Sequence, residues 1–199
     1  MNFIETIRLP RRVTVQNNKS NLKAIGLYTA LVLGICILPG MASAQDGYTA
    51  IPDSNFEQVL IDKGIDSDGQ LDGRILTTDM AAATTIAADE AGISDLTGIE
   101  SARSLKSLLL FGNNISTLDL SNNPVLETLE VSQNFLQGNL DLSNKADLIS
   151  VDLTSNPNLR CVQVDNSADA NAKLGVYAGW SVDLWTAYSD DCNAMFPGN

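Results

Sequence analysis

The side chains best suited to chemistry are acids in the glycine-containing stretch DSDGQLDG, residues 66–73. Asp66, Asp68 and Asp72 supply the oxygen ligands that calcium prefers. A calcium loop of the EF-hand type also ends in a bidentate Glu, and Ile75 stands in that place if the first glycine of the stretch is the loop glycine. We therefore favour a solvated acidic turn, keep the three aspartates as weak calcium candidates, and expect no other metal or cofactor.

Catalysis is not expected, because the sequence contains no histidine. Nucleophilic systems that need a histidine base, and zinc sites built on histidine, are therefore excluded. Paired carboxylates could serve glycoside hydrolysis. With 24 acidic residues in the chain, however, some pair will lie at any chosen separation, so proximity alone would not indicate an enzyme.

A repeat organises the chain around residues 105–118, LKSLLLFGNNISTL, which follow the pattern LxxLxLxxNxIxxL. The pattern resembles one leucine-rich repeat, in which an LxL pair forms a short strand and the Asn turns the corner. It recurs at spacings of 22, 21 and 22 residues. The equivalent inward positions are Ile86, Leu108, Leu129 and Val151, and an Asn follows five residues after the last three, at Asn113, Asn134 and Asn156.

A second series lies half a repeat out of phase, at Leu96, Leu118, Leu140 and Val162, each 22 residues apart. Its last three members begin apolar pairs that are separated by one residue, which is the period of a strand. We expect each coil to have two extended sides. A compact α/β domain with scattered leucines would have to keep both registers over four coils, so the predicted fold is a leucine-rich repeat solenoid of short parallel strands and loops.

The N-terminal residues 1–44 are predicted to be a signal peptide. Five basic residues and one acid precede the apolar run of residues 24–38, and Ala42-Ser43-Ala44 supplies a cleavage site. A retained membrane anchor is the alternative, although the 15-residue run is short for a bilayer span of about 20 residues. The remaining chain has seven basic and 23 acidic residues, a net charge of −16, which disfavours nucleic acid and anionic membranes as partners.

We expect the repeats, residues 81–160, to be closed at both ends. Residues 45–80 would form an N-terminal cap whose helix starts with a capping box at Ser54 and Glu57. Residues 161–199 would form a C-terminal cap closed by a disulfide between Cys161 and Cys192, worth about 3 to 4 kcal/mol of loop entropy. The aromatic residues near this end, among them Trp180 and Trp185, are expected to seal the core rather than to stack on sugar.

The outward residues of the stacked strands are the candidate ligand site, because a solenoid presents them as one concave face. Leu109 and Phe111 alternate with inward leucines, and so should contact solvent or a partner. Packing against a loop or the N-terminal cap is the equally weighted alternative. The predicted face consists of Leu109, Phe111, Glu130, Ser132, Asp152 and Thr154. Asp119 and Asp141 occupy matching half-repeat positions, where hydration rather than calcium should relieve their repulsion.

The segments IPDSNFEQVLIDKGID, AGISDLTGIE and NPNLRCVQVD, with the LxxLDLSNN half-repeats, resemble secreted leucine-rich repeat proteins of the Bacteroidetes and flavobacterial type, which have internalin-like repeats. The resemblance implies an exported, non-catalytic binding or adhesion module. It would be secreted to the periplasm or the exterior, with attachment to the cell surface as an option. Its partner would be an extracellular protein or glycan. The alternative is a passive envelope protein without a dedicated ligand. We expect a monomer without a transmembrane segment after cleavage.

Overall fold

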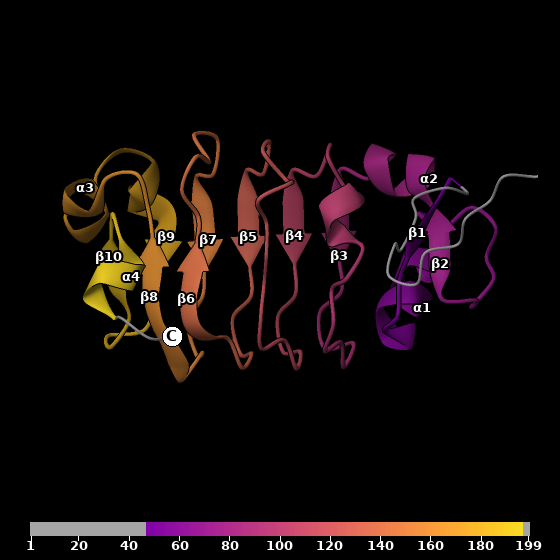
Figure 1. The fold of residues 1–199 in the computed structure, drawn as a ribbon, viewed down its shortest axis with the longest axis horizontal. Coiled ribbons are helices and arrows are strands. Elements are labelled where there is room, and N and C mark those ends of the chain that lie inside the picture. The colour runs from indigo at the N-terminus through magenta and orange to yellow at the C-terminus, as the bar shows by residue number, and fades with distance from the viewer. Residues whose placement is uncertain (1–46, 197–199) are drawn as a thin grey trace, which may run out of the picture. The chain divides into compact units, whose positions relative to one another are not determined.

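The computed structural model describes residues 47–196, and these contain two parallel sheets and one antiparallel pair of strands. The larger sheet has five strands in the order β3, β4, β5, β7 and β9, which lie side by side in Figure 1. These strands are Thr85–Ala87, Ser107–Leu109, Thr128–Glu130, Ser150–Asp152 and Trp180–Ser181. Each strand pairs in parallel with the next, as expected for successive coils of a leucine-rich repeat fold.

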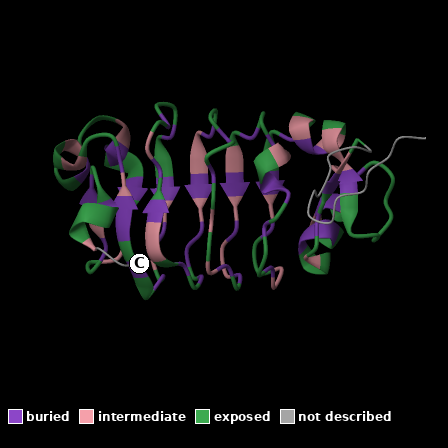
Figure 2. Cartoon of the chain, in the orientation of Figure 1, coloured by how far each residue is buried: buried purple, intermediate pink, exposed green. Residues whose placement is uncertain are grey.

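The central residue of each coil confirms the predicted register. Ile86 pairs with Leu108, Leu108 with Leu129, and Leu129 with Val151. All four side chains are buried in one continuous core. Val151 then pairs with Trp180, so an aromatic residue continues the row of aliphatic ones. Figure 2 shows the buried residues of these strands at matching heights.

The second sheet has the order β10, β8 and β6, with bounds Ala187–Ser189, Asn158–Gln163 and Gln137–Asp141. Leu140 pairs with Val162, so the half-repeat prediction is confirmed for these two residues. It is wrong for the pair that begins at Leu118, which belongs to no strand, and Leu96 also lies outside the strands. After Leu96 the chain turns at Gly98, whose φ is 104°, into the 3₁₀ helix η1, Ile99–Ser101. The preceding coil therefore offers the Leu118 segment no strand to pair with.

The three repeat asparagines form a ladder through the core. Asn134 accepts a hydrogen bond from the Ile115 N–H at 3.0 Å and donates to the Leu110 carbonyl at 2.8 Å. Asn113 and Asn156 make the same pattern of contacts one coil away on either side. Each side chain is at most 3% exposed. The ladder therefore gives the turn amides of the neighbouring coil an acceptor where no water is available to bind them.

Residues before the repeats form β1, Tyr48–Ala50, paired antiparallel with β2, Arg74–Leu76, together with helices α1, Ser54–Asp62, and α2, Thr77–Ala82. The predicted capping box is wrong. Asp53 is the N-cap, and its Oδ1 accepts from the amides of residues 55 and 56. Its other oxygen accepts from Ser94 and Asp95, so the same carboxylate joins α1 to the first coil. Glu57 turns instead to the loop before β2.

Glu57 is 2% exposed, and its Oε1 accepts three backbone amides, from Asp72, Gly73 and Arg74, at 2.9, 2.7 and 3.1 Å. A single carboxylate oxygen therefore fixes the loop that enters β2. Backbone donors, in place of a basic side chain, thus satisfy this buried oxygen.

The C-terminal part adds α3, Ser167–Asn171, the 3₁₀ helix η2, Gly175–Gly179, and α4, Cys192–Met195. The predicted disulfide is confirmed, with Cys161 of β8 bonded to Cys192 of α4. Trp180 packs edge-on against Tyr177 at a ring separation of 4.9 Å, and its indole N–H donates to the Leu148 carbonyl. Trp180 is thus part of the core as expected, whereas Trp185 is 58% exposed and the expectation fails for it.

The predicted signal peptide, residues 1–44, lies outside the described residues. Among residues 47–196 the structure contains no helix that is long and apolar enough to cross a membrane.

A candidate binding face on the five-stranded sheet

The outward residues of the five-stranded sheet align in columns across the strands. Three of the predicted face residues form one column by strand pairing, because Leu109 lies beside Glu130 and Glu130 beside Asp152. Ala87 precedes this column and Ser181 follows it. We call the surface that carries the predicted columns the sheet face. Its register follows from the inward residues, since successive side chains on a strand point to opposite sides.

Leu109 and Phe111 are both half-buried, and neither belongs to the apolar core or to the partly buried residues packed against it. The ladder continues beyond β4, because the Leu110 N–H donates to the Glu130 carbonyl and the Gly112 N–H to the Ser132 carbonyl. Phe111 is thereby held beside the next coil, and its own N–H donates to the Asp89 carboxylate at 3.0 Å. An aliphatic and an aromatic side chain therefore stand together on an ordered backbone.

The acidic half of the sheet face is organised by short hydrogen bonds. Glu130 accepts from the Ser132 hydroxyl at 3.1 Å. Asp152 accepts from both the N–H and the hydroxyl of Thr154, at 2.9 and 2.7 Å. Ser132 is 5% exposed, so this predicted contact residue is largely covered, and its hydroxyl orients Glu130. The structure thus brings all six predicted residues to one face, with Ser132 least available to a partner.

Sequence reasoning missed a third column on the same face. The strands β3, β4, β5 and β7 each begin with a hydroxyl residue, and these residues pair in register. The signal was present in the sequence, since each lies one residue before an inward repeat position. The column consists of Thr85, Ser107, Thr128 and Ser150.

The three calcium candidates make hydrogen bonds or an ion pair with groups of their own loop. Asp66 Oδ1 accepts from the Asp68 N–H, and Asp68 accepts from the Gln70 N–H. Asp72 pairs with Arg74 at 3.0 Å. Burial, followed by the charges of Asp68 and other nearby acids, raises the pKa of Asp66. Within residues 47–196 no group of three or more acidic, cysteine or histidine side chains is placed to hold a metal ion. Calcium binding by this loop stays a prediction.

Asp119 and Asp141 each cap a local turn, accepting from the N–H of Ser121 and Ser143 at 2.9 Å. The hydrogen bonds from Ser121, and then the charge of Lys145, lower the pKa of Asp119. Neighbouring protein groups therefore stabilise this carboxylate in its ionised form.

No protein-family model and no curated protein sequence matches the chain. Among solved structures it is similar to an internalin, InlF, of Listeria monocytogenes, at 21% identity and a TM-score of 0.49, over 68% of this chain and 37% of that one. It is also similar to the functional domain of InlJ of the same organism, at 16% identity and a TM-score of 0.41, over 71% of this chain and 48% of that one. A third similar structure is the Listeria internalin C2, at 20% identity and a TM-score of 0.44, over 78% and 87% of the two chains.

The chain thus spans less than half the length of the first two structures. Its own repeat pattern and stacked parallel strands define the class, a leucine-rich repeat fold.

Proposed function

We propose that this chain is a non-catalytic binding module that attaches to a protein partner through the sheet face. The observation that carries the proposal is the position of Leu109 and Phe111, half-exposed and outside the core in the middle of a sheet whose other outward residues are polar except for the small Ala87. Apolar anchors surrounded by a polar rim are the usual arrangement of a protein-binding surface.

The charge of the face indicates the kind of partner. Glu130 and Asp152 follow Leu109 along one column, and Asp89 lies beside Phe111. Like charges across an interface are costly, so a partner that covers Leu109 and Phe111 should present basic side chains to the acids. A glycan is less suitable at the centre of this face, because Leu109 and Phe111 offer no hydrogen bonds to its hydroxyl groups.

Export is part of the same proposal. The sequence of residues 1–44 indicates a signal peptide, and a disulfide is typical of proteins that leave the cytoplasm. The partner would accordingly be an extracellular or periplasmic protein, and the module would act there as a monomer in solution or at the cell surface.

The test is binding by the Leu109→Asp/Phe111→Asp variant to a panel of purified extracellular protein domains and glycans. The matched control is Phe135→Asp, because Phe135 is also an exposed aromatic residue, at 54%, but precedes the strand β6 of the other sheet. We expect the double variant to lose a partner that the wild type and the control both retain, at an unchanged melting temperature. A passive envelope protein would instead bind none of the panel, and the double variant would change only stability.

A further inference from the structure

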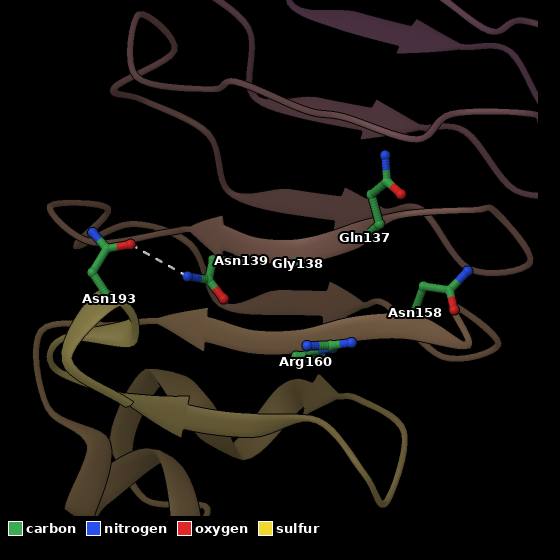
Figure 3. Close-up of a pocket in the computed structure, with 6 residues that line it drawn as sticks. All are labelled: Gln137, Gly138, Asn139, Asn158, Arg160 and Asn193. Atoms are coloured by element: carbon green, nitrogen blue, oxygen red, sulfur yellow. Dashed lines mark hydrogen bonds between the residues drawn. The ribbon is translucent and has the colours of Figure 1, made fainter. Parts of the chain in front are cut away.

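A hollow on the second sheet has a composition unlike the rest of this acidic chain. It has a volume of about 650 Å³, and four of its six lining residues carry amide side chains. The fifth is an arginine and the sixth a glycine, so no carboxylate lines it. Figure 3 shows these residues, which come from β6, β8 and α4: Gln137, Gly138, Asn139, Asn158, Arg160 and Asn193.

Arg160 lies at a bulge in the pairing of β6 with β8. Gly138 pairs with Leu159 and Asn139 pairs with Cys161, so Arg160 has no partner on β6. An extra residue of this kind bends the strand and changes the direction of a side chain, and bulges are frequent beside functional sites. Arg160 is exposed and makes no ion pair with the residues that the structure describes.

Asn139 supplies a second unused group at the same bulge. Its Nδ2 donates to Asn193 Oδ1 at 3.4 Å, the contact drawn in Figure 3. Its Oδ1 is inaccessible to water and has no hydrogen-bond partner in the described part of the chain. A buried carbonyl oxygen without a donor is costly, and a turn of the Asn139 amide that presents this oxygen to a ligand hydroxyl in the hollow would remove that cost.

The disulfide builds the third wall. Asn193 follows Cys192 in α4, and Cys192 is bonded to Cys161, next to Arg160 on β8. The bond therefore holds an amide of a distant segment over the bulge. This fixed position makes the hollow a formed site rather than a gap between mobile side chains.

We propose that this hollow binds an acidic glycan, with the carboxylate of a uronic acid on Arg160 and its hydroxyl groups on the surrounding amides. A guanidinium binds a carboxylate through two parallel hydrogen bonds. Amide side chains both donate and accept, as sugar hydroxyl groups require. No apolar side chain lines the hollow to receive a peptide side chain, which favours a sugar over a peptide terminus.

The negative charge of the whole chain does not prevent this. At physiological ionic strength charges are screened over about 8 Å, so the groups that line the hollow decide the local potential. Two smaller hollows extend from it along the same side of the coils. The first, of about 200 Å³, shares Gln137 and Asn139, and the next, of about 270 Å³, shares Thr117, Leu118 and Asp119 with the first. Neutral sugars that follow the uronic acid would lie there, and their hydroxyl groups would donate hydrogen bonds to the Asp119 carboxylate.

The test titrates the full chain, with its disulfide oxidised, with an aldobiouronic acid, a glucuronic acid linked to one neutral sugar. Binding is followed by the NMR signals of the arginine Nε–H and asparagine amide groups. The carboxyl-reduced disaccharide and N-acetyl-alanyl-alanine, a peptide with a free carboxylate, serve as competing probes. We expect the uronic acid to shift the Arg160 and Asn139 signals, and the two other probes to bind at least tenfold more weakly.

The variants are Arg160→Gln, which keeps a polar side chain of similar reach, and the control Arg103→Gln, an exposed arginine far from the hollow in sequence. Arg160→Gln should weaken binding at least tenfold and Arg103→Gln should not change it. Equal binding of the reduced sugar or of the peptide would overturn the proposal, as would no shift up to about 10 mM, a weak affinity even for a small ligand. Because the sheet face takes no part, failure here leaves the proposed function untouched.

Discussion

Removing Asn134, the central asparagine of the ladder, should destabilise the fold because it leaves a buried backbone amide without an acceptor. Asn134 makes four hydrogen bonds, but the three carbonyls it donates to each have another donor. Leu110 also accepts from Asn113, Val131 from Asn156, and Ser132 from the Gly112 N–H. The group left without a partner is the buried Ile115 N–H, which Asn134 accepts at 3.0 Å.

An unpaired buried amide costs about 1 to 3 kcal/mol, and each short hydrogen bond lost contributes about 1 kcal/mol. We therefore expect Asn134→Ala to lower the free energy of unfolding by about 3 kcal/mol, measured by urea denaturation followed through the fluorescence of the buried Trp180. Asn122→Ala is the control, because Asn122 is exposed and its side chain donates only to Ser121 at 3.3 Å. It should cost less than about 0.5 kcal/mol. A loss below about 1 kcal/mol for Asn134→Ala would refute the stabilising role of the ladder.

Three further predictions concern the same unfolding measurement. Burial raises the pKa of Tyr188 to about 12, so the stability gained by keeping its phenol neutral is fully present below pH 10 and is lost as the pH rises towards 12. Its hydroxyl has no partner among the described residues, so Tyr188→Phe should be about 1 kcal/mol more stable at neutral pH and should lose less stability in that alkaline range. Parallel pH profiles for the two proteins would contradict this. Glu57→Ala should cost about 3 kcal/mol, because three loop amides lose their acceptor, whereas Glu57→Gln should cost about 1 kcal/mol, because its amide oxygen still accepts; equal losses would show that a neutral oxygen cannot replace the carboxylate and would contradict this. Gln133 has a φ of 54°, where Gly112 stands one coil earlier at 68°, so Gln133→Gly should stabilise by about 0.5 kcal/mol, and a loss would show that its side chain contributes more than its backbone strain.

The repeat register could be predicted from the sequence because it depends on period alone. Leu108, Leu129 and Val151 must all point inward if one does, and the Asn that follows each must then meet the turn of the next coil. The disulfide was also predictable, since Cys161 and Cys192 are the two cysteines that follow the predicted signal peptide. These features need no knowledge of how distant segments pack.

The N-cap of α1 was not predictable from local spacing. Ser54 and Glu57 fit a capping box, but Asp53 is favoured because its second oxygen also binds Ser94 and Asp95 of the first coil. A contact between residues about 40 positions apart therefore overrides a local signal. The sequence gives no indication of that contact until the fold is known.

Lys145, at the turn that follows a half-repeat position, was likewise not predictable from local sequence. Asn123 donates to the carbonyls of Ile99 and Ala102, and one coil later Lys145 donates to that of Leu120. A lysine is normally expected at the surface, yet Lys145 is 6% exposed, and burial lowers its pKa. Its long side chain replaces an asparagine because the carbonyls need a donor, whichever residue supplies it.

The hollow beside Arg160 could not be found in the sequence, because it depends on a bulge and on the disulfide. The bulge removes one residue from the pairing of β6 with β8, and α4 brings Asn193 across from the end of the chain. The sheet face, in contrast, was found except for its column of hydroxyl residues.

Photo-crosslinking tests whether the sheet face contacts a protein. The amino acid p-benzoyl-phenylalanine is placed at Phe111, with Phe135 as the matched position before β6, and the crosslinked proteins are identified by mass spectrometry. Both are phenylalanines with an accessible ring, so the two proteins differ in the surface that they probe. We expect one specific protein adduct from position 111 that position 135 does not give. The same adducts from both positions, or none from position 111, would contradict it.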